Sequence, residues 1–254
     1  MLAHLAGGAS EGLTRNVDAL ETRVDGRAAL TLATLRFLTH PALRAVFPQY
    51  LIHLYHSMRT AGAVMECARA RSAALADRCP VAARLAPYWA NHIQEESGHD
   101  EWLLADLARL GVNVDRAVAL VPAPEVAELM GTLHFWIQHA HPVGALAYFY
   151  VVERSPPTEA LLDRIVQSAR IPREALQTFY RHASIDVAHA RELEALIDSL
   201  PLTGDHLELM AMSATTVVRQ LTRICELMIQ RADSALAQPL SRSGNGQRVV
   251  PSLA

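Results

Sequence analysis

Apolar residues recur every three or four positions along most of this chain, and runs of β-branched residues are scarce. This period is typical of amphipathic helices, and the abundance of alanine, leucine and arginine favours the same structure. We find no segment that has the alternating pattern of a β-strand. The sequence therefore predicts an all-α fold.

Proline and glycine mark the expected ends of these helices, because neither residue continues an α-helix readily. Breaks of this kind fall around Pro41, at Pro80, between Gly111 and Pro122, and at Pro201. They leave a bundle of about seven or eight helices. The predicted helices span residues 10–37, 42–77, 81–110, 124–139, 142–154, 158–169, 173–199 and 204–237.

The length and composition of the chain suit one domain. Of its 254 residues, 51% are hydrophobic, which is enough to bury a large core. We expect a single helical domain over residues 1–237. From residue 238 the helical period gives way to serine, glycine and proline, so we expect residues 238–254 to form a flexible tail.

Charge and hydropathy exclude several classes of function. The formal net charge is −3, so no basic excess would attract nucleic acid. No run approaches the roughly eighteen apolar residues that span a bilayer, and the first residues lack a basic leader followed by an apolar segment. We expect a soluble, cytoplasmic protein that binds neither nucleic acid nor membranes.

The cysteines give no sign of a disulfide framework or a structural zinc site. Cys67, Cys79 and Cys225 are an odd number, and none of them belongs to a C-x-x-C pair. We interpret them as buried thiols.

The most informative segment contains His182, Asp186 and His189. Spacings of four and three residues place two imidazoles and a carboxylate on one face of the predicted helix 173–199. Such a stripe can bind a metal ion. The same three side chains could also form an ordinary solvated face.

A second segment contains Glu96-x-x-His99, and Asp186-x-x-His189 has the same form. Carboxylate-bridged diiron bundles use this i, i+3 pair to present two ligands to the interior. Glu95 competes with Glu96 for this role, because a residue four positions before His99 would share its face; we favour Glu96. Two such motifs predict two further lone carboxylates on other helices.

Glu66 and Glu153 match this expectation. Glu66 interrupts a run of small apolar residues, and Glu153 ends a segment of aromatic and aliphatic residues. A carboxylate in apolar surroundings is costly unless it is paired or bound to a metal. The alternatives are an ion pair between Glu153 and Arg154, and for Glu66 a partner elsewhere at the edge of the core.

Oxygen and imidazole donors without a thiolate suit iron or manganese better than structural zinc. The remaining histidines have no distinctive spacing, and we interpret them as structural or solvated. The candidate metal ligands are Glu66, Glu96, His99, Glu153, His182, Asp186 and His189.

These residues resemble the haem-oxygenase-like diiron oxidases and oxygenases, which share their fold with the thiaminase-like and pyrroloquinoline-quinone-synthase-like proteins. The resemblance rests on the segment 95–102, on the segment that ends at Glu153, and on the stripe 182–189, and it covers roughly residues 40–200. It implies two Fe(II) ions, dioxygen as co-substrate and a small, amino-acid-derived substrate. The implied reactions are N-oxygenation, desaturation or oxidative C–C cleavage, in which an external electron donor could take part.

Residues one or two turns from the predicted ligands are natural walls of a substrate pocket. Arg59 is placed to bind a substrate carboxylate, although a surface position would explain it as well. The aromatic candidates, which ordinary core packing would also explain, are Trp102, Phe149 and Tyr150.

Three other functions compete with the diiron hypothesis. A metal-free enzyme on the same fold would use a cysteine nucleophile, for which Cys67 beside Glu66 is the candidate. A haem protein would need an axial histidine near the first helix, where only His4 lies. A helical binding protein would not need buried acids. The long apolar stripe of the last predicted helix could support a homodimer, and packing within the monomer explains it equally well.

Overall fold

The computed structural model describes residues 15–154 and 156–237. Within them it contains eleven α-helices, two short 3-10 helices and no strand, which confirms the all-α prediction. The predicted tail, 238–254, lies outside the described residues. The elements are α1 (Asn16–Glu21), α2 (Arg27–Leu38), α3 (Leu43–Leu75), α4 (Pro80–Glu96), α5 (His99–Arg109), α6 (Val114–Val118), α7 (Pro124–His139), η1 (Pro142–Ala145), α8 (Leu146–Val152), α9 (Glu159–Ala169), η2 (Arg173–Leu176), α10 (Gln177–Ser199) and α11 (Gly204–Ala237).

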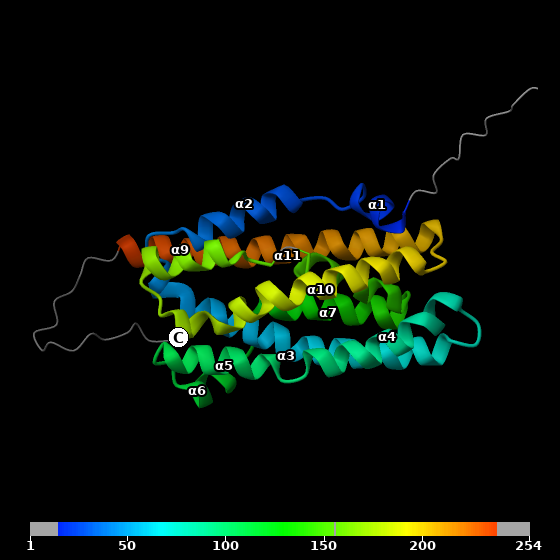
Figure 1. The fold of residues 1–254 in the computed structure, drawn as a ribbon, viewed down its shortest axis with the longest axis horizontal. Coiled ribbons are helices and arrows are strands. Elements are labelled where there is room, and N and C mark those ends of the chain that lie inside the picture. Colours follow the sequence, from blue (N-terminus) through cyan, green and yellow to red (C-terminus); the bar gives the residue numbers. More distant parts are fainter. Residues whose placement is uncertain (1–14, 155, 238–254) are drawn as a thin grey trace, which may run out of the picture.

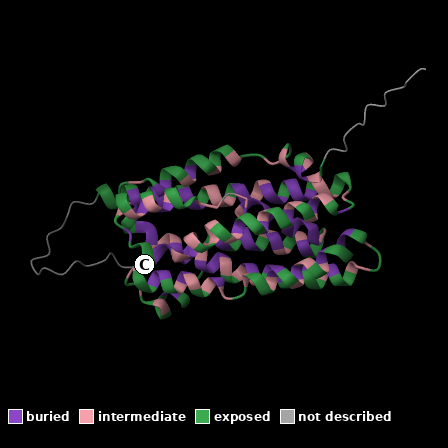
Figure 2. Ribbon diagram, viewed as in Figure 1, coloured by how far each residue is buried: buried purple, intermediate pink, exposed green. Residues whose placement is uncertain are grey.

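The long helices lie side by side along the length of the molecule (Figure 1). Helix α3 packs against α4, α5 and α7, while α11 packs against α2, α7 and α8. Helix α10 contacts α5 and α8 and closes the bundle between them. The buried faces of these helices point inward, and their exposed faces point outward (Figure 2). This arrangement follows from the helical period of the apolar residues.

Glycine divides two of the predicted helices. The predicted helix 81–110 is interrupted between α4 and α5, where Gly98 has a φ of 84°. The predicted helix 10–37 is interrupted between α1 and α2, where Gly26 has a φ of 85°. Only glycine adopts this left-handed conformation at little cost, so each glycine allows the chain to begin a new helix.

Two apolar clusters fill the core. One includes Trp89 and Phe149 and joins α4, α8 and α11; the other includes Phe47 and Leu103 and joins α3, α5 and α11. None of the described helices is long and apolar enough to cross a membrane.

Candidate metal centre

Four helices bring the predicted ligands together. Glu96 is the last residue of α4, His99 is the first of α5, and Glu153 directly follows α8. The stripe from His182 to His189 lies in the first half of α10. The sequence predicts one continuous helix through Glu96 and His99, and this is wrong: the two residues lie on either side of the turn at Gly98.

The first group of possible metal ligands contains Glu96, His99 and His182. Oε2 of Glu96 accepts a hydrogen bond from Nδ1 of His99 at 3.1 Å. The rings of His99 and His182 are 5.1 Å apart. Nδ1–H of His182 donates to the carbonyl of Thr178 at 2.8 Å, which leaves Nε2 of His182 free to bind a metal.

The second group contains His92, Glu153 and His189, all of which are buried. Nε2 of His92 lies 3.1 Å from Oε1 of Glu153, and the rings of His92 and His189 are 5.3 Å apart. Nδ1 of His189 lies 3.4 Å from Oε1 of Glu96. Glu96 therefore directs one carboxylate oxygen to His99 of the first group and the other to His189 of the second.

Unsatisfied polar atoms show that these groups fit a bound cation. Oε2 of Glu153 and Nδ1 of His189 are buried, and neither makes a hydrogen bond within the described residues. Such atoms are costly to bury unless a ligand satisfies them. The donors are carboxylate oxygens and imidazole nitrogens, which suit iron.

The pKa values of the acids reflect the same crowding. Burial, together with the nearby carboxylates of Glu153 and Glu96, raises the pKa of Asp186 to about 8. Burial also raises the pKa of Glu153, although His92 opposes this shift. Burial acts on Glu96 as well, but the hydrogen bond and charge of His99 outweigh it and lower the pKa of Glu96. Several carboxylates packed together in this way favour the presence of a cation.

Asp186 is buried and lines the cavity beside both groups, but it belongs to neither. Glu95 and Glu96 differ in burial: the side chain of Glu95 is 45% exposed and that of Glu96 15%. Glu95 lies near His92 at 3.5 Å and His189 at 3.9 Å, both of the second group, whereas Glu96 contacts both groups; the preference for Glu96 as a ligand stays a prediction.

The expectation that Glu66 is surrounded by apolar residues is wrong. Its side chain is 52% exposed and pairs with Arg69 at 2.8 Å. Arg69 lies one turn after Glu66 on the same helix, so this partner is a neighbour in the sequence. Glu66 borders the cavity but is in neither group of ligands, so its role as a ligand stays a prediction.

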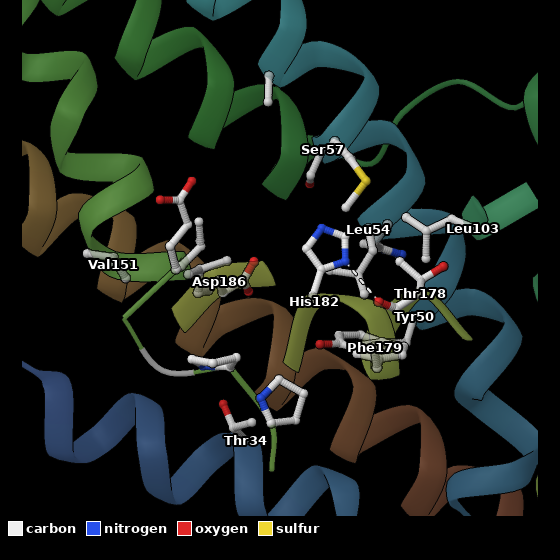
Figure 3. Close-up of a pocket in the computed structure, with 18 of the residues that line it drawn as sticks. Thr34, Tyr50, Leu54, Ser57, Leu103, Val151, Thr178, Phe179, His182 and Asp186 are labelled. Carbon is white, nitrogen blue, oxygen red and sulfur yellow. Dashed lines mark hydrogen bonds between the residues drawn. The ribbon is translucent and has the colours of Figure 1, made fainter. Parts of the chain in front are cut away.

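A cavity of about 1000 Å³ opens beside the centre. Figure 3 shows His182 and Asp186 directed into it from α10, with residues of α3 near His182. Its walls are mainly apolar and aromatic, and the labelled lining residues include Tyr50, Leu54 and Phe179.

Two of the four predicted substrate-binding residues line this cavity. They are Arg59, whose guanidinium donates to the hydroxyl of Tyr55 at 2.8 Å, and Phe149, whose ring contacts His92. Trp102 and Tyr150 are not among the described lining residues. Trp102 stacks on the ring of His99 at 3.9 Å. Tyr150 accepts a hydrogen bond from Arg154.

His92, interpreted from the sequence as structural or solvated, belongs to the second group of possible ligands. Its spacing held a usable signal, because His92 lies four residues before Glu96, just as His182 lies four residues before Asp186. Tyr88, one turn earlier on α4, stacks on His92 with ring centroids 5.3 Å apart and fixes its orientation.

Asp106 is a buried residue that positions His182. Its Oδ2 accepts a hydrogen bond at 2.9 Å from the backbone N–H of Thr178, in the first turn of α10. The carbonyl of Thr178 in turn accepts the Nδ1–H of His182. Asp106 is thus connected to a candidate ligand through a single residue.

Comparisons with known proteins identify a family and a fold for this chain. The model of a family described as "Iron-containing redox enzyme" matches residues 48–221, a segment that contains every predicted ligand. No curated protein matches the chain.

Two solved structures share the fold. The first is a domain of unknown function with a haem-oxygenase-like fold from Shewanella denitrificans (TM-score 0.65, 16% identity, covering 90% of this chain and 94% of that one). The second is a TenA homolog from Pseudomonas syringae pv. tomato (TM-score 0.62, 15% identity, covering 85% and 91%). The predicted haem-oxygenase-like fold is confirmed.

Proposed function

Since this chain belongs to the iron-containing redox enzyme family, we propose that it is a non-haem diiron enzyme that uses dioxygen to oxidise a small metabolite. One observation carries the proposal: Glu96 lies between two groups of ligands and contacts both. A carboxylate in that position is suited to bridge two metal ions.

The two groups would each hold one iron. Glu96, His99 and His182 would bind the first, and His92, Glu153 and His189 the second. Asp186 is in neither group, but the charges of Glu153, Glu96 and His92 act on it, so it lies near both. Two bound ferrous ions would supply the electrons and the Lewis acidity that dioxygen activation requires.

The surrounding residues control water and protons at this centre. Phe149 and Trp89 pack against His92 and shield the second group on that side. Burial lowers the pKa of His182 and so keeps its imidazole neutral and able to bind metal. Without a metal, the pKa of Asp186 is raised to about 8, so its carboxyl group holds a proton at neutral pH that a bound cation would displace.

The cavity favours an apolar or amphipathic substrate. Its lining is mainly aromatic and aliphatic, and Arg59 at its wall could pair with a substrate carboxylate. Derivatives of aromatic and branched-chain amino acids combine these two features and belong to the substrate class that the sequence predicted. N-oxygenation, desaturation and C–C cleavage are all compatible with such a substrate. An external donor would supply any electrons for dioxygen reduction that the substrate does not provide.

The thiaminase-like alternative needs an activated cysteine near the substrate. Of the described residues that line the cavity, the cysteine is Cys225, and burial raises its pKa. An activated nucleophile requires the opposite shift. Cys67, the candidate from the sequence, is not among the described lining residues; its Sγ accepts a hydrogen bond from Gln138 at 2.8 Å. These observations favour the diiron proposal.

Iron loading under anaerobic conditions tests the proposal. We would count the iron bound per chain and follow the visible spectrum on mixing with dioxygen. We expect two irons in the wild type and a transient long-wavelength band. His182→Ala and Glu153→Ala should each bind less iron and lose the band, because each removes a ligand from one group.

His139→Ala is the matched control, because His139 is exposed and its ring contacts Phe135 outside the centre. It should behave like the wild type. If the wild type binds no stoichiometric iron, or if His182→Ala and Glu153→Ala bind as much as His139→Ala, the diiron proposal is wrong.

A further inference from the structure

A second cluster of metal-binding side chains lies where three helix junctions meet. Cys79 precedes α4, His141 lies between α7 and η1, and His206 is in the first turn of α11. One ligand atom from each of these residues lies within 4.8 Å of the others. The three positions are far apart in sequence, which is why their spacing gave no sign of a site.

The three side chains face one another. Sγ of Cys79 lies 3.3 Å from Nε2 of His141. The rings of His141 and His206 are 4.7 Å apart and inclined at 60°. All three residues are partly buried, so the cluster is shielded but can still be reached from solvent.

Backbone contacts hold these side chains in place. Nδ1 of His141 accepts a hydrogen bond from the N–H of Val143 at 3.1 Å. Nδ1 of His206 accepts one from the N–H of Thr203 at 3.2 Å. Sγ of Cys79 caps α4 by accepting the N–H of Ala82.

Both imidazoles are neutral at physiological pH, as metal binding requires. Burial, with smaller contributions from His206 and Arg71, lowers the pKa of His141 to about 4. Burial also lowers the pKa of His206.

We propose that Cys79, His141 and His206 bind a zinc ion at the end of the bundle. A thiolate with two imidazoles is a donor set that zinc prefers, and water would complete the tetrahedral coordination. The proposed site is separate from the iron centre: Cys79 precedes His92 by thirteen residues along α4, a rise of about 20 Å. It also differs in chemistry, because neither group of the iron centre contains a cysteine.

Binding replaces protons with the metal. The thiol of Cys79 loses its proton to solvent as the Sγ–Zn bond forms. At each histidine the metal takes Nε2, so the ring proton moves to Nδ1 and competes there with the backbone N–H donor. This competition and the open fourth position make the site weaker than a closed structural site with four protein ligands. Bound zinc would link three helix junctions and oppose unfolding.

Cobalt(II) provides a test that the iron centre cannot mimic. Cobalt takes the place of zinc, and a cobalt–thiolate bond gives a charge-transfer band in the near ultraviolet. We would titrate the full-length protein with Co²⁺ under reducing conditions. In the wild type the intensity of this band should correspond to about one thiolate-bound cobalt ion per chain. Excess Zn²⁺ should abolish the band.

The variants identify the ligands. Cys79→Ser should lose the band, and His141→Ala and His206→Ala should need more than tenfold more cobalt to reach it. Serine is a good N-cap, so Cys79→Ser retains the start of α4. Cys67→Ser is the matched control and should keep the full band, because Cys67 is also partly buried but lies outside the cluster.

Thermal unfolding gives a second readout. Zn²⁺ should raise the Tm of the wild type and of Cys67→Ser by more than it raises the Tm of Cys79→Ser, in which only the other centre can bind the metal. The proposal is overturned if the wild type gives no cobalt–thiolate band, if the band survives in Cys79→Ser, or if Cys67→Ser loses it. None of these results depends on whether the other centre binds iron, because its described ligands include no thiolate.

Discussion

The link from Asp106 to His182 leads to a prediction about stability. Asp106 is completely buried, and its Oδ2 accepts the backbone N–H of Thr178, which is 3% exposed. Thr178 then positions His182 through its carbonyl. Asp106→Ala would leave the Thr178 N–H in the interior without its acceptor, whereas Asp106→Asn would retain an oxygen that can accept it.

The expected magnitude follows from these contacts. A buried donor that loses its partner costs about 1–3 kcal/mol, so Asp106→Ala should lower the free energy of unfolding by that amount. In a domain of this size, each kcal/mol shifts the Tm by roughly 2–4 °C. Asp106→Asn should leave the free energy of unfolding unchanged or raise it, because burial raises the pKa of Asp106 and so makes its charged form unfavourable. The amide avoids that cost.

The pH dependence of the stability separates the loss of the hydrogen bond from the cost of burying the charged carboxylate. Because the folded pKa of Asp106 is raised, the wild type is most stable relative to Asp106→Asn below the unfolded pKa of about 4. This advantage is lost as the pH rises through the folded pKa. Urea unfolding of the three proteins across this range, without metal, would measure both effects.

An Asp106→Ala variant as stable as the wild type at every pH would refute this reasoning, since the Thr178 N–H would then not depend on the carboxylate. Iron binding provides an independent check. Asp106→Ala should also weaken iron binding, because the start of α10 would no longer hold His182 in place, whereas Asp106→Asn should bind iron as the wild type does.

Four further predictions concern single residues. Glu96→Gln should reduce the iron bound at both positions, while Glu95→Gln should retain it, as measured by metal analysis; equal losses would show that Glu96 does not bridge the groups. His92→Ala should lower the iron content toward one per chain, and an unchanged content would exclude His92 as a ligand. Gly98→Ala should lower the free energy of unfolding in urea by about 1–2 kcal/mol. This cost comes from the left-handed backbone alone, because an added Cβ would meet no atom within 4 Å. The lowered pKa of His141 means that the metal-free protein should lose stability as the pH falls from about 6.5 to 4, because the unfolded chain gains a proton there that the folded chain does not; His141→Gln should show a shallower decline.

The sequence predicted the class of the fold because the evidence for it is local. A helical period is visible within any stretch of a few turns, and so are the prolines that end helices. What could not be predicted was where a long helix divides. A glycine within a helical pattern is often tolerated, so Gly26 and Gly98 gave no clear sign that the chain adopts a left-handed conformation there.

The candidate ligands were predictable to the extent that neighbours on one helix face reveal them. His182, Asp186 and His189 lie on α10 as their spacing predicted. Glu66 shows the limit of this method: its apolar neighbours in sequence suggested burial, but the side chain points outward to Arg69. Burial depends on which helices pack together, and sequence neighbours do not determine this.

The position of Glu96 explains why local spacing nevertheless pointed to two residues that lie in contact. Glu96 ends α4 and His99 begins α5, so the turn between them replaces the single helical turn that the i, i+3 rule assumes. A continuous helix would direct both side chains to the same side. Ending α4 at Glu96 frees its carboxylate to direct one oxygen to His99 and the other to His189 on α10. The left-handed glycine at 98 therefore joins α4 to α5 in a way that leaves Glu96 in contact with both groups of side chains, as the proposed two-metal centre requires.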